Sequence, residues 1–148
     1  MSGLAISVST EGVRSPVSRA RLAAAARLAL RAGKVRHALV SVTLVTKPRI
    51  AALNARHLRH RGPTDVISFA FSRERGRPLV ADIYIAPAVA RGNARRLGVG
   101  VREELVRLVV HGVLPALGHD HPDGEARLLS PMWRKQEALV GRAMRTGA

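Results

Sequence analysis

The sequence predicts an α+β fold in which a small sheet of four strands is covered by helices. Short β-branched runs with partial alternation, such as residues 37–46, are typical of strands. Longer Ala- and Leu-rich runs with helical periodicity, such as residues 17–32, are typical of helices. Because no repeat or low-complexity tract divides the 148 residues, we expect one domain over residues 1–148.

Each element is predicted from its own local pattern. The expected strands are residues 4–9, 37–46, 66–71 and 80–85, and the last two should form a hairpin. The expected helices are residues 17–32, with Ser18 as cap and Gly33 as stop, 48–57, 87–97, a helix that begins at 101, and 123–145, interrupted at Ser130-Pro131. Residues 58–64 read as a basic loop, and residues 73–78 as a charged turn.

Charge is the strongest compositional signal. The chain has 25 Lys and Arg against 10 Asp and Glu, a net charge of +15, which favours a polyanionic partner such as RNA. A GC-rich genome is the alternative explanation, because nearly all of the cations are arginine. No apolar run is long enough to span a membrane, and no secretory signal begins the chain, so we expect a cytoplasmic protein without a membrane partner.

The most informative stretch is Val101–His121. Its apolar periodicity predicts a helix that carries His111 near its end, and His119, Asp120 and His121 follow after a glycine. Neutral imidazole is a common ligand of zinc-like metals, so this spacing predicts a metal or catalytic site. The alternative is a hydrogen-bonded core histidine followed by a polar loop. No Glu follows His111 as HExxH requires, which argues against a metalloprotease.

Pro115 occupies the helical position that faces the same way as His111. Proline offers no side-chain donor for a metal, and it removes the hydrogen bond back to the His111 carbonyl. It also disfavours helical backbone angles at Leu114. We therefore expect the helix to kink or end here.

Other polar residues have two readings each. Thr64 and Asp65 are predicted to fix a loop-to-strand corner by bonding local amides, in preference to a catalytic role. Asp82 is expected either to orient a histidine through its second nitrogen or to be a solvated edge residue. Arg56, Arg59 and Arg61 form a basic cluster suited to phosphate binding, with a solvated surface as the alternative.

Three segments together resemble the YbeY-type endoribonucleases, the bacterial rRNA maturation factors. They are LNARHLRHRGPTDVISFAF (53–71), ADIYIAP (81–87) and HGVLPALGHDHP (111–122). The resemblance covers most of residues 38–140. It implies a small mixed four-stranded sheet packed with helices, with the metal-site helix near the C-terminal third. It also implies a zinc-dependent endoribonuclease that prefers single-stranded RNA and acts in rRNA processing and ribosome quality control.

Carried over by position, the family's first and third metal histidines fall on His111 and His121, while the second falls on Pro115. The family's functional arginine falls on Leu58, so its neighbour Arg59 becomes the candidate, beside His111, for a catalytic role. A single zinc ion would then take His119 or Asp120 as its third protein ligand.

Two functional hypotheses remain open at this point. The first is a metal-assisted endoribonuclease that acts on ribosomal or other single-stranded RNA and meets the ribosome. The second is an RNA- or ribosome-binding protein that has kept the fold and lost catalysis, which the changes at Pro115 and Leu58 favour. A metal hydrolase acting on peptides or small molecules has only the histidines in its support. The sequence carries no signal for an oligomeric state.

Overall fold

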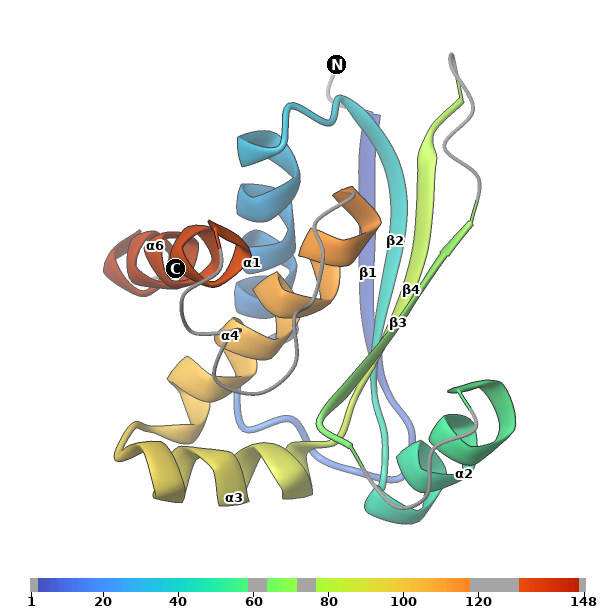
Figure 1. Ribbon diagram of the computed structural model, residues 1–148, viewed down its shortest axis with the longest axis vertical. Helices are drawn as coiled ribbons and strands as arrows, with labels where there is room; N and C mark the ends of the chain where they lie inside the picture. Colours follow the sequence, from blue (N-terminus) through green and yellow to red (C-terminus); the bar gives the residue numbers. More distant parts are fainter. Residues whose placement is uncertain (1–2, 59–63, 72–76, 118–130, 147–148) are drawn as a thin grey trace.

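The sheet is mixed and has four strands (Figure 1). The computed structural model describes residues 3–58, 64–71, 77–117 and 131–146. The strands are β1 (Gly3–Thr10), β2 (His37–Leu44), β3 (Val66–Phe71) and β4 (Leu79–Ile85). Their order is β1-β2-β4-β3; the pairs β1–β2 and β2–β4 are parallel, and β3 is antiparallel to β4. The predicted α+β class, the mixed sheet and the hairpin are therefore confirmed.

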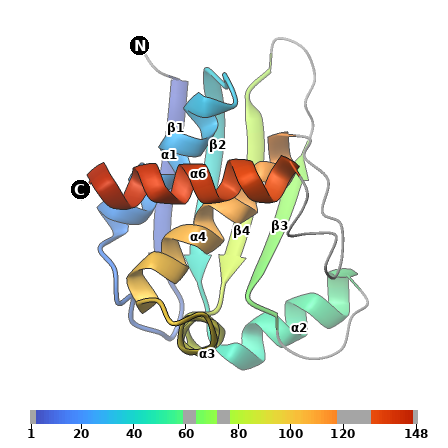
Figure 2. The same cartoon turned by 60° about the vertical axis from the view of Figure 1, so that its left-hand side comes forward.

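The helices lie mainly on one face of this sheet (Figures 1 and 2). They are α1 (Arg19–Ala32), α2 (Lys47–Leu58), α3 (Pro87–Leu97), α4 (Val101–Val113), the short 3₁₀ helix η1 (Leu114–Leu117) and α6 (Pro131–Thr146). α1 and α4 cover the sheet, and α6 lies across both on the side away from it. α2 packs on the opposite face, so the described helices cover the two faces of the sheet unequally. No described helix is long and apolar enough to cross a membrane.

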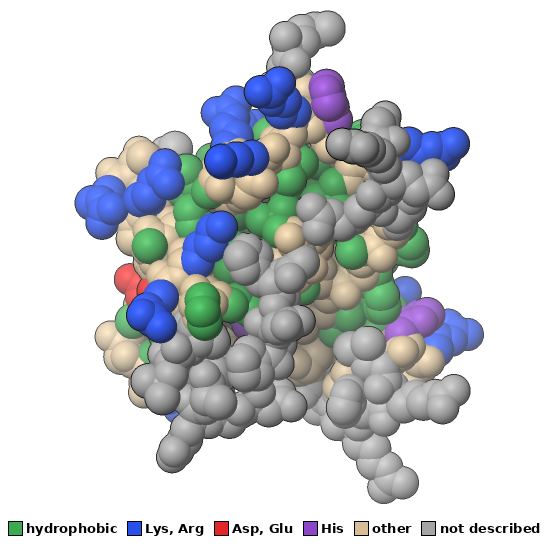
Figure 3. Space-filling view, turned by 45° about the horizontal axis from the view of Figure 1, so that its top comes forward, with side chains coloured by type: hydrophobic (Ala, Val, Ile, Leu, Met, Phe, Trp, Pro, Cys, Tyr) green, Lys and Arg blue, Asp and Glu red, His purple; other side chains and the backbone are tan. Residues whose placement is uncertain are grey.

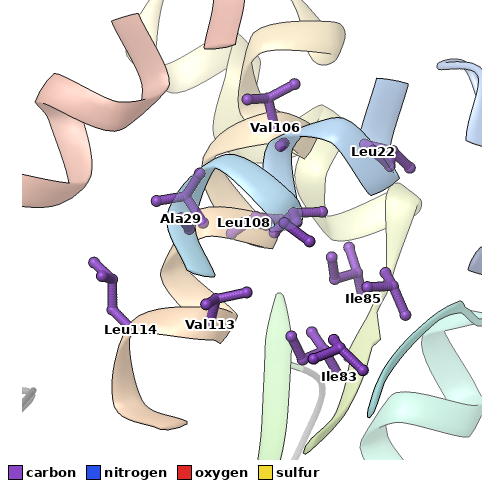
Figure 4. Close-up of a cluster of buried hydrophobic side chains, with 14 of the residues drawn as sticks. Leu22, Ala29, Ile83, Ile85, Val106, Leu108, Val113 and Leu114 are labelled. Carbon is purple, nitrogen blue, oxygen red and sulfur yellow. The ribbon is translucent and has the colours of Figure 1, made fainter. Parts of the chain in front are cut away.

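Aliphatic side chains fill the space between α1, α4 and the sheet. β4 alternates strictly: its residues 79, 81, 83 and 85 are buried, and the residues between them are only partly buried. Figure 4 shows Ile83 and Ile85 of this strand pointing toward Leu108 and Val113 of α4 and toward Leu22 of α1. A smaller cluster that includes Ile50 and Leu53 packs α2 against the other face.

Pro115 decides where α4 ends. The helix ends at Val113, and η1 follows it across Pro115, as expected from a residue that cannot donate to the His111 carbonyl. The expectation for Leu114 is wrong, because its backbone keeps right-handed helical angles (φ −59°, ψ −41°). Leu114 is fully buried in the core, and this burial outweighs the modest steric preference imposed by the following proline.

The predicted cap and stop residues of α1 are confirmed. Ser18 caps α1 by accepting a hydrogen bond from the Arg21 N–H at 3.1 Å, and Gly33 follows the helix. Gly98 has a positive φ of 68° at the end of α3, the left-handed conformation that glycine tolerates best. Within the predicted helix 123–145, the structure describes α6 from Pro131, and proline is favoured in the first turn of a helix. Residues 118–130 lie outside the described part.

Candidate functional site

His111 lies in the last turn of α4, on the stripe that faces α3 and α6. Leu105 and Val109 bury the opposite side of the helix, and the polar stripe repeats at helical spacing through Glu104, Arg107 and His111. Just beyond it, Gly112 lies so close to the sheet that a Cβ there would come within 2.8 Å of the Ile83 side chain. Only glycine permits this approach, so the end of α4 is held at a fixed depth against β4.

A hydrogen bond from β3 adds a second constraint on this end of the helix. The Ser68 hydroxyl donates to the Gly112 carbonyl at 2.8 Å. Ser68 belongs to the same strand that begins just after Asp65. The strand therefore positions the residue next to His111 directly.

The ring of His111 is oriented by Gln136 of α6. Its Nδ1 is hydrogen-bonded to the Gln136 Oε1, and the Gln136 Nε2 donates to a carboxylate oxygen of Glu137 at 3.1 Å. An ionised carboxylate only accepts hydrogen bonds, which settles the orientation of the amide. The amide oxygen therefore faces the ring, so the protonated nitrogen on this side is Nδ1, which donates to Gln136.

Arg107 holds Glu137 in the position that this chain of hydrogen bonds needs. Its guanidinium donates twice to Glu137, at 2.9 Å each, and also contacts Glu104 at 3.0 Å and Glu103 at 3.1 Å. The hydrogen bonds with Glu137 raise the pKa of Arg107 despite the opposing effect of burial, so the cation is permanent. Arg107 thereby ties α4 to α6 beneath the histidine.

The two most strongly held glutamates have pKa values that shift in opposite directions. Burial raises the pKa of Glu104, which is 2 % exposed, and this effect outweighs its bonds to Arg107 and Asn93. Burial would also raise the pKa of Glu137, but the bonds from Arg107 and Gln136 outweigh it and lower the pKa. Glu137 is therefore the ionised acceptor at neutral pH on which the Gln136 orientation depends.

Asp65 joins the same network from the start of β3. The Asn93 side-chain amide of α3 donates to Asp65 at 2.9 Å and to Glu104 at 3.2 Å. The Asp65 carbonyl accepts from the Ala86 N–H at 3.1 Å. Asp65 was expected to fix this corner by accepting from a nearby backbone amide. Its side chain instead accepts from Asn93 of α3, so its role is structural but involves a different partner. Thr64, beside it, is half-buried.

These groups surround a cavity of about 360 Å³, which is in the range of small-ligand pockets. Its wall is formed by Asp65, Asn93, Arg96, Leu97, Glu104, Arg107, Leu108, His111, Trp133 and Gln136. The predicted site residues His111 and Asp65 therefore meet at one cavity. Arg107, Asn93, Glu104, Gln136 and Ser68 were missed by sequence reasoning, although charged residues on an otherwise apolar helix were a usable signal for two of them.

Other predicted site residues lie elsewhere. Asp82 points from the face of β4 opposite Ile83, where it accepts a hydrogen bond from the Ser41 hydroxyl at 2.7 Å. It does not orient His111, because Gln136 occupies that place. Arg56 is exposed on α2, on the other face of the sheet from α4. Arg59, Arg61, His119, Asp120 and His121 lie outside the described residues, as does the side chain of Leu58.

The predicted metal ligands lie partly within the described residues and partly outside them. The described residues contain no group of three or more His, Asp or Glu side chains arranged to hold a metal ion. His111 contributes an imidazole at the end of α4, and Pro115 has no donor atom. Of the predicted ligands, only His111 lies within the described residues.

The fold and the cavity define a small α+β protein whose candidate site is built on a histidine at the end of a buried helix. The model of the Endoribonuclease YbeY family matches residues 7–143. The chain is 37 % identical to Endoribonuclease YbeY of Frankia casuarinae, over 93 % of this chain and 73 % of that protein. It is 34 % identical to that of a Parafrankia species, over 93 % and 92 %. The chain belongs to the Endoribonuclease YbeY family.

A solved structure has the same fold. The solution structure of a Thermotoga maritima protein matches with a TM-score of 0.61 and 26 % identity, over 93 % of this chain and 88 % of that protein. The arrangement of α4 against the sheet is therefore part of a fold that occurs in other proteins.

Proposed function

We propose that this protein is an endoribonuclease that hydrolyses phosphodiester bonds of single-stranded RNA in rRNA maturation, and that it meets the ribosome in doing so. The observation that carries the proposal is the hydrogen-bonded orientation of His111 beside a cavity, in a member of the Endoribonuclease YbeY family. A histidine held in one tautomer can accept or deliver a proton at a defined atom, which is Nε2 here.

The chain's own residues contribute in three ways. Gln136 and Glu137 keep the His111 ring in one orientation. Arg107 preserves that arrangement through its bonds to Glu137. Arginines of the predicted cluster, Arg56 with Arg59 and Arg61, would bind the phosphate backbone, and Arg59 would stabilise charge at the reacting phosphate.

We further propose one zinc ion at this site. His111 and His121 would bind it, and His119 or Asp120 would complete the ligand set. A bound zinc ion would lower the pKa of a water molecule and polarise a phosphate oxygen. Because Pro115 removes one ligand position, we expect weaker zinc binding than a site with three histidines would give.

Cleavage and metal content should be measured on the same preparations. We expect the protein to cleave a labelled single-stranded RNA, and His111→Ala to reduce the rate by about 100-fold or more. His37→Ala is the matched control, because His37 is exposed at the start of β2. Equal activity of His111→Ala and the control would contradict the proposal.

The second candidate function is RNA or ribosome binding without cleavage, which the proline at position 115 favours. The variant Pro115→His separates the two. If only this variant binds zinc and cleaves RNA, the protein is a binding member of the family. If the unmodified chain already cleaves and loses activity with His111→Ala, it is an enzyme.

A further inference from the structure

α1 and α6 carry an unbalanced positive charge. Together they contain eight basic residues, which are Arg19, Arg21, Arg27, Arg31, Arg134, Lys135, Arg142 and Arg145. Their single acidic residue is Glu137, which is engaged by Arg107 of α4. In Figure 3, many of the Lys and Arg side chains lie on the left, which is the side of α1 and α6 in Figure 1. This surface is separate from the predicted cluster around Arg56.

A groove lies between these two helices. It has a volume of about 200 Å³ and is lined by Arg21, Arg27 and Arg31 of α1 and by Thr146 at the end of α6. Its floor consists of alanine, leucine and valine side chains, and no acidic residue of the described chain lines it. This volume is below that of most small-molecule pockets, which suits a single anionic group better than a whole organic ligand.

One nitrogen of an arginine that lines the groove lacks a partner within the described part of the chain. The Arg21 Nε is fully buried and makes no hydrogen bond to any of the described residues. Buried donors are nearly always paired, and an arginine side chain pairs best with phosphate or carboxylate oxygens. Three arginines thus line the groove, and one of them has a buried nitrogen that no acceptor of the described chain satisfies, a combination that favours an anion such as phosphate.

α6 connects this groove to the candidate active site. Gln136, near its first turns, contacts His111, and Thr146 at its end lines the groove. Ten residues of helix separate them, about 15 Å at the rise of an α-helix. Arg142 and Arg145 are exposed on the stretch between them. A single strand bound at His111 can therefore reach the groove within a few nucleotides.

We propose that the groove between α1 and α6 binds a backbone phosphate of the RNA strand whose cleaved bond lies at His111. The inference rests on the proposed function, because it assumes that the strand is RNA. In this proposal the arginines of α1 bind the RNA strand at a distance from the phosphodiester bond that is cleaved. Contacts of this kind hold the strand in register and carry no sequence preference.

The test is the salt dependence of RNA binding by the double variant Arg27→Gln, Arg31→Gln. The probe is a fluorescent single-stranded RNA followed by anisotropy, with its integrity checked on a gel. The control is Arg91→Gln, Arg95→Gln, which removes the same charge from exposed positions of α3. Each lost phosphate contact lowers the slope of log K against log salt by roughly 0.7 for a single strand, so loss of the one phosphate in the groove should lower it by about 0.7 in the groove variant.

The outcomes distinguish this inference from the proposed function. A lower slope and weaker binding in the groove variant, with the control unchanged, support the phosphate site. If both double variants lose the same amount, or neither loses any, the groove is not a specific contact and the inference is wrong, while RNA cleavage by the unmodified chain still stands. If the unmodified chain neither binds nor cleaves RNA, the proposed function itself fails. A second arm measures binding of both double variants to anionic lipid vesicles; a loss there by the groove variant, with RNA binding unchanged, would show that the groove binds a membrane surface and not RNA.

Discussion

The two ends of α6 use charged residues in opposite ways. Near its start, Glu137 and Gln136 are bonded to Arg107 and His111, so polar groups there are satisfied within the protein. Near its end, Arg142 and Arg145 are exposed beside the arginines of α1. The comparison teaches that charged residues with internal partners hold the His111 ring in place, whereas the exposed cations add positive potential to the surface.

The largest expected effect is on stability, at the start of α6. Arg107→Met would leave three glutamates near one another without their shared cation, and we expect unfolding to cost about 3 kcal/mol less. Urea denaturation measures this difference. Arg102→Met on the same helix is the control, since Arg102 is exposed. A loss no larger than in the control would show that the network contributes little to folding.

The second-largest effect is expected on the orientation of the His111 ring. Gln136→Leu removes the acceptor of the His111 Nδ1–H, and we expect a loss of about 10- to 100-fold in activity or metal affinity. Imidazole ¹⁵N chemical shifts would report a mixed tautomer in this variant and a single one in the unmodified protein. Gln136→Glu keeps an acceptor and should retain the single tautomer. An unchanged tautomer in Gln136→Leu would contradict the proposed orientation.

The two glutamates predict opposite dependences of stability on pH. The pKa of Glu137 is lowered in the folded state, so its contribution is present above the ordinary value of 4.5 and is lost on acidification through the lowered pKa. The pKa of Glu104 is raised, so its contribution is present below 4.5 and is lost as pH rises through the raised pKa.

Urea unfolding of Glu137→Gln and Glu104→Gln across this range separates the two contributions. We expect the first variant to lose less stability than the unmodified chain on acidification below pH 4.5. The second should lose less as pH rises above 4.5. Parallel pH profiles for both variants would show that the two carboxyl groups do not differ in the folded protein.

The smallest effect is expected at the other end of α6. Arg142→Gln removes an exposed cation without an internal partner in the described network, so the free energy of unfolding should change by no more than about 0.5 kcal/mol. The same urea experiment as for Arg107→Met provides the comparison. A large loss at Arg142 would remove the distinction between the two ends of the helix.

Most of the fold followed from local patterns, while only part of the site did. His111 was found because a histidine at the end of an apolar helix is visible in one dimension. Gln136 was missed, because it lies 25 residues away and nothing in its neighbourhood marks it as a partner of the ring. Asp82 drew attention as a carboxylate in an apolar strand, yet the alternation of the strand points it away from α4.

The sequence alone determined the helices, the strands, the positive charge and the end of α4 near Pro115. These depend on side-chain periodicity, composition and the missing N–H of proline, which are properties of neighbouring residues. Only the tertiary structure decided which nitrogen of His111 carries its proton and which arginines share a groove. Both depend on α6 lying across α1 and α4, and such contacts between distant segments exist only once the chain is packed (Figure 2).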